Sequence, residues 1–481
     1  MPLLPVVRAT LLAAALVAGV LVASGSPAAA VPECPPSCDG ADPATAQGDS
    51  RPVPDAAAAG RIVTLHISDP DDLGWASIAQ AAPGDEVWLD RTFDGGSNWD
   101  GKVGAVTLAV GQQTARTLMY QLDDKPRHRI GALRACGRSA ATGEIACTAW
   151  ARSRWNAGTR IAAAATALTA YYNFQTGVWP NIGWWNTANA VTALIDYYDR
   201  TGSVAYRYVI ARTYNLNRTA ELGEFRAKYI DDTGWWGLAW VRAYDLTGEA
   251  QYLHSAQIAA DYMAGYWDAK CGGGVWWDAA RTYKNAITNE LYLKLVAALH
   301  NRIPGDTANL TRATTAWDWF RSSGMINSDH LVNDGISSAT CRNNGGRTWT
   351  YNQGVILGGL TELHRATGDP AVLGEATAIA TAATTSPSLV VAGVLTEPCR
   401  TICGGPDQPS FKGAFVRNLG ELDRTLPGRP YRKFLQAQVA SLWATDRTSL
   451  DQYGLNWAGP MANLDAATQH SALDAYTAAL P

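Results

Sequence analysis

Two neighbouring carboxylates, Asp231 and Asp232, stand directly before paired tryptophans in the segment EFRAKYIDDTGWWGLAWVRAYDLTG (224–248). One interpretation is a helix cap and turn before a helix that begins at Trp235, because Asp accepts backbone N–H bonds there. The other is an acid/base pair. Two close carboxylates in a partly apolar cleft cannot both ionise easily, so one pKa should rise. The local sequence alone favours capping, and the setting of the pair has to decide.

A protonated acid beside an ionised carboxylate is the equipment for glycoside hydrolysis. Adjacent residues can place their carboxyl groups about 5–5.5 Å apart, which is the separation found in retaining enzymes. Inverting enzymes need about 6.5–9.5 Å, because a water molecule must fit between the two groups. If the pair Asp231 and Asp232 is catalytic, its spacing therefore favours retention of the anomeric configuration.

Aromatic and amide side chains gather in similar segments elsewhere in the chain. Tryptophan offers a broad flat face with one polar N–H, which suits sugar rings, and Asn and Gln both donate to and accept from hydroxyl groups. The expected substrate-binding residues are Trp184, Trp185, Asn186, Trp235, Trp236, Trp276, Trp277, Asn285, Asn289, Tyr351, Asn352, Gln353 and Lys412. The alternatives are core packing for one ring of each Trp pair, backbone capping for the amides and surface ion pairing for Lys412.

Helices must position these residues. From about residue 155, helical runs meet at tight turns whose glycine can take the left-handed conformation that ends a helix. These turn glycines are Gly202, Gly248, Gly305, Gly368 and Gly428. Their intervals of roughly 46–63 residues each correspond to one helical hairpin plus a longer connection. An opening helix at about 156–172 and a closing one at about 462–479 bring the expected number to twelve.

The connections between these helices alternate between short turns and long loops. The long loops are expected at about 173–186, 218–234, 266–283, 324–351, 386–411 and 446–461. Successive antiparallel helices place all the long loops at one end, where the Trp, Gly, Asp and Asn clusters would meet. The predicted fold is mainly α, an (α/α)6 barrel (twelve-helix toroid) over residues 155–481, preceded by a small β-rich N-terminal domain.

The N-terminal part divides into three segments. Residues 1–30 are predicted to be a signal peptide, because Arg8 precedes an apolar run and small residues lie at the expected cut. Residues 31–60, rich in Pro, Ala, Ser and Asp, are expected to be a disordered leader. Residues 61–150 carry short β-like runs and form a small β-rich domain of unknown role. Within it, Thr92–Trp99 (TFDGGSNW) resembles the Asp-box, a β-hairpin turn that is structural far more often than functional.

Composition narrows the possible functions. The 481 residues carry a formal charge of -4, which leaves no basic surface for nucleic acid. Eight cysteines fit an oxidising compartment, and we expect the pairs Cys34–Cys38, Cys136–Cys147, Cys271–Cys341 and Cys399–Cys403. The seven histidines show no pair at ligand spacing, so no metal and no cofactor are expected. The prediction is a secreted, extracellular monomer without a membrane anchor.

Five motifs in order, YIDDTGWWGLAW, GGGVWW, KNAITNE, TYNQG and FKGAFVR, make residues 155 to 481 resemble the bacterial endo-α-1,6-mannanases, glycoside hydrolase family 76. The resemblance implies an (α/α)6 barrel that hydrolyses α-1,6-linked mannan backbones with retention. It also implies that Asp231 is the nucleophile and Asp232 the acid/base. The β-rich region lies outside the resemblance.

Other functions remain open at this point. The same barrel could carry a transglycosylase that remodels α-mannan, or a non-catalytic protein that binds α-mannan polysaccharide or oligosaccharide. Retention of both Asp231 and Asp232 argues against the binding protein. A polysaccharide lyase is less attractive, because it would need cations and a His or Tyr base, and the expected face is rich in Trp, Asp and Asn.

Overall fold

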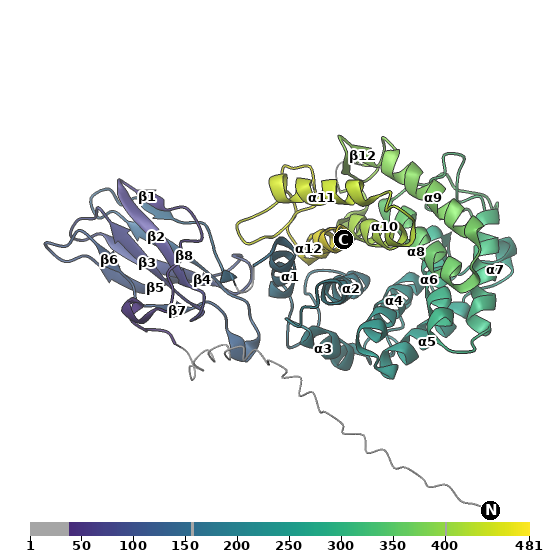
Figure 1. Ribbon diagram of the computed structural model, residues 1–481, viewed down its shortest axis with the longest axis horizontal. Coiled ribbons are helices and arrows are strands. Elements are labelled where there is room, and N and C mark those ends of the chain that lie inside the picture. The colour runs from purple at the N-terminus through teal and green to yellow at the C-terminus, as the bar shows by residue number, and fades with distance from the viewer. Residues whose placement is uncertain (1–37, 155–157, 400–401) are drawn as a thin grey trace, which may run out of the picture.

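The computed structural model describes residues 38–154, 158–399 and 402–481, with a β-rich part followed by a mainly helical part (Figure 1). The expected signal peptide lies outside the described residues. The leader predicted to be disordered over 31–60 is described from residue 38, and there the prediction is wrong. Its segment Pro43–Thr45 is a 3-10 helix, and Ser50 exchanges two backbone hydrogen bonds with Ile67. The leader therefore joins the sheet that follows it.

The β-rich part consists of two antiparallel sheets that face each other. Its strands are β1 (Ala56–Ala58), β2 (Arg61–Ser68), β3 (Leu73–Ala79), β4 (Glu86–Thr92), β5 (Asp100–Thr107), β6 (Ala115–Arg116), β7 (Tyr120–Gln121), β8 (Ala132–Arg138) and β9 (Ile145–Cys147). One sheet has the order β1-β2-β3-β6, with β7 also paired to β3, and the other has the order β5-β4-β8-β9. Every second residue of β2, such as Val63 and Leu65, enters the core between the sheets and meets Val87 and Leu89 of β4.

The Asp-box turn lies between β4 and β5 and is held by its own side chains. Asp94 accepts from the backbone N–H of Asn98 at 2.9 Å, and the Thr92 hydroxyl donates to the Asn98 carbonyl at 2.6 Å. The tip of the turn lies against the helical part. A Cβ atom at Gly95 would lie 2.3 Å from Nε2 of Gln452, which itself bonds the Tyr171 hydroxyl at 2.8 Å. The turn thus packs on the helical part, and its Gly95 has a φ of 73°, in the left-handed region that favours glycine.

The described residues contain twelve α-helices, which confirms the mainly α prediction. They are α1 (Arg160–Ala170), α2 (Trp184–Thr201), α3 (Tyr208–Asn217), α4 (Ile230–Thr247), α5 (Ala250–Ala264), α6 (Ala286–Arg302), α7 (Ala308–Ser322), α8 (Thr350–Thr367), α9 (Pro370–Thr385), α10 (Phe411–Thr425), α11 (Arg432–Thr445) and α12 (Ala466–Ala478). Two short antiparallel strand pairs lie in the loops. The strand β10 (Lys284–Asn285) pairs with β11 (Gly335–Ile336) across the segment that contains α6 and α7, and β12 (Val390–Val391) forms a hairpin with β13 (Val394–Leu395).

The even-numbered helices form a closed inner ring. Each one packs on the next, from α2 through α4, α6, α8 and α10 to α12, which returns to α2 (Figure 1). The odd-numbered helices pack on the outside of this ring. The inner helices approach closely: a Cβ at Gly354 of α8 would lie 2.4 Å from Cα of Phe415 in α10. Such contacts bury the inner helices almost completely.

The two ends of the ring differ as the sequence predicted. Gly202, Gly248 and Gly368 directly follow α2, α4 and α8 with φ of 69°, 72° and 70°, so these helices end in tight left-handed turns. The long loops lead into the N-termini of the inner helices. These N-termini therefore gather at the opposite end from the turn glycines.

Three disulfides link cysteines as expected: Cys136–Cys147, Cys271–Cys341 and Cys399–Cys403. The fourth expected pair includes Cys34, which lies outside the described residues. None of the helices in the described part of the chain combines the length and the apolar run needed to cross a bilayer.

Candidate functional site

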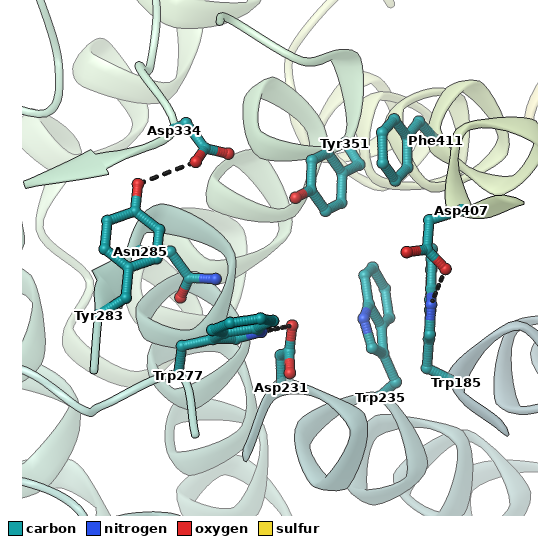
Figure 2. Close-up of a pocket in the computed structure, with 10 residues that line it drawn as sticks. All are labelled: Trp185, Asp231, Trp235, Trp277, Tyr283, Asn285, Asp334, Tyr351, Asp407 and Phe411. Carbon is teal, nitrogen blue, oxygen red and sulfur yellow. Dashed lines mark hydrogen bonds between the residues drawn. The ribbon is translucent and has the colours of Figure 1, made fainter. Parts of the chain in front are cut away.

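A pocket of about 300 Å³ opens at the long-loop end of the inner ring, and we call it the central pocket. Its ten lining side chains surround one open space (Figure 2). They are Trp185, Asp231, Trp235, Trp277, Tyr283, Asn285, Asp334, Tyr351, Asp407 and Phe411. Six of these, namely Trp185, Asp231, Trp235, Trp277, Asn285 and Tyr351, belong to the residues expected from the sequence.

Helix N-termini supply half of this lining. Trp185, Asp231, Tyr351 and Phe411 lie in the first turns of α2, α4, α8 and α10, and Asn285 caps α6. The partial positive charge at these helix ends favours carboxylates beside them. The helix α4 begins at residue 230, five residues before the start expected at Trp235, because Asp in a first turn complements the helix dipole. The aspartate pair therefore lies on a helix and not in the middle of a loop.

Asp231 is half-buried on the pocket floor. Its Oδ2 accepts a hydrogen bond from the indole Nε1 of Trp277 at 3.0 Å, and its Oδ1 accepts from the backbone N–H of Asp232 at 3.1 Å. Burial raises the pKa of Asp231, while these two hydrogen bonds oppose the rise because they favour the ionised form. The Asp231 carboxylate is thus held in place by Trp277, an aromatic residue of the wall, and its oxygens are not both occupied by backbone N–H groups of the helix end.

Asp232 is also half-buried, although it is not among the ten lining residues. No described residue donates a hydrogen bond to its carboxyl group. Burial, followed by the neighbouring charge of Asp231, raises the pKa of Asp232 well above its usual value. The two aspartates therefore differ: one carboxylate is stabilised by donors, and the other carboxyl is left to keep a proton.

Two further carboxylates line the pocket. Asp334 accepts from the Tyr283 hydroxyl at 2.8 Å, and Asp407 accepts from the indole Nε1 of Trp185 at 2.7 Å. Burial raises the pKa of both groups. No lysine, arginine or histidine is among the described lining residues. The central pocket is consequently an acidic and aromatic site that excludes a preformed anion-binding role.

Stacked aromatic rings build the walls. Trp185 stacks on Trp235 with ring centroids 5.2 Å apart, and Tyr351 stacks on Phe411 at 4.0 Å. Figure 2 shows Trp277 on the other side of Asp231 from Trp235. Such rings present flat apolar faces, while the carboxylates and Asn285 present hydrogen-bonding groups. This combination suits a sugar, which has an apolar ring face and a rim of hydroxyl groups.

The other expected tryptophans lie outside the pocket lining. Trp236 is fully buried, and Trp184 packs on it with ring centroids 4.7 Å apart. Trp276 is buried and donates from its indole Nε1 to Asp268 at 2.7 Å. In each Trp pair, one ring therefore lines the pocket and the other belongs to the protein interior.

The expected amides have mostly structural partners. Asn186 donates to the Ser410 hydroxyl at 2.7 Å, Asn289 bonds both backbone groups of Val275, and Gln353 does the same with Val332. Asn352 is fully buried in α8. Asn186, Asn289 and Gln353 thus fix loops to helices behind the pocket, and Asn285 is the expected amide that lines the pocket itself.

Lys412 is buried and does not form the surface ion pair that was its alternative. Its ammonium group donates to the Leu455 carbonyl and lies 4.6 Å from the ring centroid of Trp457. It lines a separate cavity together with Glu397. Burial lowers the pKa of Lys412 to about 8, against the attraction of Glu397.

Four lining residues were not expected from the sequence: Tyr283, Asp334, Asp407 and Phe411. Asp407 and Phe411 belong to the cluster DQPSFKGAF before a predicted helix, and Tyr283 directly precedes the KNAITNE motif. Asp407, Phe411 and Tyr283 could have been predicted from their positions just before or at the start of an inner helix. Asp334 carries no such local signal, because it reaches the pocket through the β10–β11 pairing.

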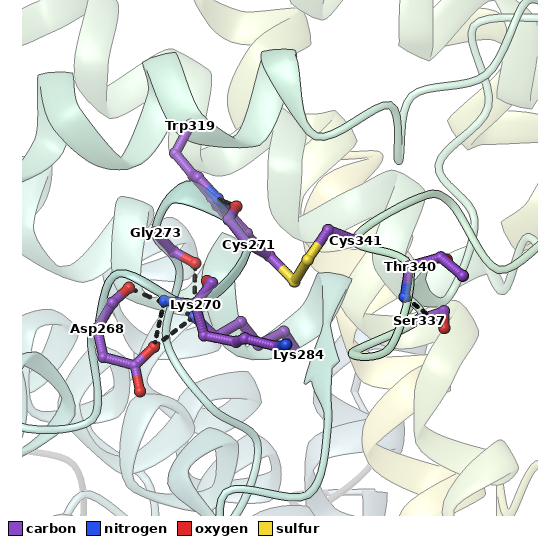
Figure 3. The surroundings of a disulfide bond; sticks show 9 residues. All are labelled: Asp268, Lys270, Cys271, Gly273, Lys284, Trp319, Ser337, Thr340 and Cys341. Carbon is purple, nitrogen blue, oxygen red and sulfur yellow. Dashed lines mark hydrogen bonds and ion pairs between the residues drawn. A yellow bond between two sulfur atoms is a disulfide. The ribbon is translucent and has the colours of Figure 1, made fainter.

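One wall of the pocket is braced by a buried lysine and a disulfide (Figure 3). Lys284 is fully buried and donates to the Asp268 carboxylate at 2.9 Å and to the carbonyls of Lys270 and Gly273 at 2.7 and 2.6 Å. The bond Cys271–Cys341 ties this loop to the loop that carries Asp334. Both loops that supply Trp277, Tyr283 and Asp334 are thus fixed to each other.

Among the described residues near the central pocket, no group of three His, Cys, Asp or Glu ligand atoms lies close enough together to hold a metal ion. The group of possible ligand atoms close enough to hold an ion is Asp90 with Cys136 and Cys147, in the β-rich part. Those two cysteines form a disulfide and so offer no thiolate.

Comparison with known proteins gives the family. The family model described as "Glycosyl hydrolase family 76" matches residues 146–480. The mannan endo-1,6-alpha-mannosidase DCW1 of Candida glabrata is 27% identical over 333 residues, which are 61% of this chain and 73% of that protein. The protein of the same name from Saccharomyces cerevisiae is 28% identical over 269 residues, or 51% of this chain and 58% of that protein. The match thus spans little more than half of the length of the Saccharomyces cerevisiae protein.

Solved structures share the helical fold. The α-1,6-mannanase GH76A of Salegentibacter sp. HEL1_6, solved as an inactive variant with two consecutive aspartates replaced and in complex with α-1,6-mannotetrose, superposes with a TM-score of 0.60. It is 24% identical, and the match covers 67% of this chain and 98% of that one. Dfg5 of Chaetomium thermophilum, in complex with glucosamine, is 20% identical with a TM-score of 0.59 over 66% and 89%.

The substitution Asp232→Asn should raise the stability of the protein at pH 7. A carboxyl whose pKa is raised by folding makes the native state bind more protons than the unfolded state, so stability falls as pH rises from about 4 through the raised pKa. An amide removes that loss, on the order of 1 kcal/mol. Thermal melting at pH 7 and pH 4 tests this: the gain should be present at pH 7 and shrink at pH 4. A variant that is less stable at pH 7 would contradict it.

Replacing both Cys271 and Cys341 by serine should destabilise the helical part by about 4 kcal/mol, because the bond closes a long segment. It should also expose the loop 323–349 to limited proteolysis. The matched control replaces Cys136 and Cys147, whose bond lies in the β-rich part. Cleavage of the loop at the same rate in both double variants would show that the first disulfide does not brace the pocket wall.

Proposed function

Because this chain belongs to glycosyl hydrolase family 76 and is a glycoside hydrolase, we propose that it cleaves α-1,6-mannosidic bonds in mannan backbones with retention of configuration. We infer that its ring of helices is an (α/α)6 barrel, with the central pocket as the active site. The observation that carries the proposal is the pair Asp231 and Asp232 at the start of α4, with one carboxylate held by hydrogen-bond donors and the other without any.

The roles of the two aspartates follow from this difference. Asp231, whose ionised form is stabilised by Trp277, attacks the anomeric carbon of the mannose and forms a covalent mannosyl ester. Asp232, whose raised pKa keeps it protonated, gives its proton to the glycosidic oxygen of the leaving sugar. The ionised Asp232 then takes a proton from water, the water oxygen attacks the same carbon, and the Asp231 carboxylate is released.

The walls of the pocket would hold the sugar chain. Trp185 with Trp235, and Tyr351 with Phe411, offer apolar faces for pyranose rings. Asp334, Asp407 and Asn285 are placed to bond hydroxyl groups. A neutral polymer such as mannan suits this lining, because the three carboxylates of the pocket would repel an acidic sugar at the cleavage point. The relatives named as mannan endo-1,6-alpha-mannosidases support the same substrate class.

The protein is proposed to act outside the cell. The sequence of residues 1–30 has the charge and hydropathy pattern of a signal peptide. The three disulfides in the described residues persist in an oxidising compartment. Both features support secretion of an enzyme that meets mannan polymers as extracellular substrates.

The substitutions Asp231→Asn and Asp232→Asn should each abolish cleavage of unbranched α-1,6-mannan while far-UV circular dichroism stays unchanged. Loss of the acid/base alone removes about 10²–10⁴-fold in rate. NMR of the first product should show the α anomer, and addition of an acceptor sugar distinguishes hydrolysis from transglycosylation. Asp318→Asn, at an exposed aspartate on α7, is the matched control. Full activity in either pocket variant, or a β product, would refute the mechanism.

The substitution Asp407→Asn should move the pH–activity profile towards lower pH. The negative charge of Asp407 contributes to raising the pKa of both Asp231 and Asp232, so its removal lowers both values. The amide oxygen of the variant can still accept the Trp185 indole bond, which keeps the wall in place. Measuring kcat/KM between pH 4 and 9 tests this, and a profile identical to that of Asp318→Asn would contradict it.

A further inference from the structure

A second cavity, of about 350 Å³, lies where the β-rich part meets the helical part, and we call it the junction cleft. The β-rich part contributes Phe93, Arg127, His128 and Arg129, and the loop between α1 and α2 contributes Phe174 and Pro180. Its size is within the range of small-ligand sites, about 300–1,000 Å³. Nothing in the proposed reaction uses this cleft.

The junction cleft and the central pocket have opposite charge. Three basic side chains line the junction cleft, at positions 127, 128 and 129, and no acidic side chain is among its described lining residues. The central pocket has three lining carboxylates and no cation. A ligand that suits the first cavity therefore carries negative charge, whereas a ligand of the second is neutral.

The two arginines are oriented by few partners and keep free donors. Both bond the single carboxylate of Asp124, Arg127 through Nη1 at 3.1 Å and Arg129 through Nε at 3.0 Å. Arg129 also lies over the ring of Phe93, 4.3 Å from its centroid. Their side chains stay 71% and 46% exposed. One shared carboxylate leaves a net positive charge, and the remaining guanidinium N–H groups match the geometry of phosphate oxygens.

The helical part closes the other side of the cleft through a stack of rings. His128 stacks on Phe174 with centroids 4.2 Å apart, and the Arg212 guanidinium lies 3.9 Å from the centroid of the same ring. Arg212 also donates to the Phe174 carbonyl at 2.7 Å. The cleft is therefore formed jointly by both parts of the chain, and neither part alone would present the same set of groups.

The junction cleft lies close to the central pocket along the chain. Pro180 lines the first and Trp185 lines the second. Five residues span at most about 18 Å when fully extended. The linings of the two cavities therefore approach each other at Pro180 and Trp185 to within the length of a few sugar units.

We propose that the junction cleft binds a phosphate group carried by a saccharide, so that Arg127 and Arg129 anchor phosphorylated glycan chains to the enzyme. The binding of a phosphorylated sugar is argued from the junction cleft alone. The anchoring of a polymer that is cleaved in the central pocket rests on the proposed mannan-cleaving function. A formal charge of -4 for the whole chain argues against nucleic acid as the source of the phosphate.

Isothermal titration of the full chain with mannose 6-phosphate, mannose and inorganic phosphate tests the binding step. Mannose 6-phosphate should bind more tightly than the other two, and binding should weaken with added salt. Arg127→Gln combined with Arg129→Gln should lower its affinity about tenfold or more, since each charged hydrogen bond contributes that order. Arg321→Gln, an exposed arginine paired to Asp318 on α7, is the matched control and should bind as the unchanged protein does.

Several outcomes would overturn the proposal. Equal binding of mannose and mannose 6-phosphate would remove the role of the charge, and equal binding of inorganic phosphate would remove the role of the sugar. Unchanged affinity in the double arginine variant, with its melting curve also unchanged, would place the ligand elsewhere. Binding to phosphatidylinositol vesicles without binding to mannose 6-phosphate would assign the cleft to a lipid surface instead.

A second measurement separates this inference from the proposed function. The double arginine variant should cleave neutral α-1,6-mannan as fast as the unchanged protein, but its KM for a phosphorylated mannan should rise. If the unchanged protein cleaves neither polymer while the arginine-dependent binding is present, the proposed function fails and the binding site stands. An equal KM for phosphorylated mannan in both proteins refutes the anchoring role.

Discussion

The desolvation of two neighbouring carboxyl groups is the constraint on which this site depends. Asp231 and Asp232 lie half-buried beside stacked indole rings, with Asp407 as a further negative charge and no lining cation to offset them. In water both groups would be ionised at neutral pH, but here burial raises the pKa of both, and the charge of Asp231 raises the pKa of Asp232 further. Under the proposed function, the same electrostatic cost that destabilises the native state at neutral pH would provide the acid and the base that glycoside cleavage requires.

The rest of the helical part offsets the electrostatic cost of burying these carboxyl groups. The N-termini of the inner helices meet at the pocket, so their partial positive charges face the carboxylates. Buried ion pairs, such as Arg417 with Asp474 at 2.7 Å and Lys294 with Glu421 at 2.8 Å, join inner helices to each other. The loops above the ring are fixed by Lys284 and the Cys271–Cys341 bond. Under the proposed function, walls fixed in this way would keep the two carboxyl groups in position, on which their catalysis would depend.

The β-rich part contributes a second cavity that the proposed reaction does not use. Its Asp-box turn contacts Gln452, and its His128 stacks on Phe174, so it is anchored to the loops at the pocket end of the ring. The resulting cleft has a charge opposite to that of the pocket. If both proposals hold, two cavities of opposite polarity let a single polymer be held by a charged substituent and cut at a neutral stretch, and the β-rich part supplies the charged cavity.

The sequence by itself determined the mainly helical fold, the turn glycines and the family, because each rests on local spacing or on an ordered series of motifs. Short separation also indicated the pairs Cys136–Cys147 and Cys399–Cys403, whereas Cys271–Cys341 was only the pair left over. It also singled out Asp231, although not its place on a helix. Only the tertiary structure decided which ring of each Trp pair faces the pocket, since Trp235 and Trp236 are alike in sequence and differ only in which neighbours surround them. It alone brought Asp334 and Asp407 to the site. Their contacts join residues far apart in the chain, and such contacts arise from helix packing that no local pattern encodes.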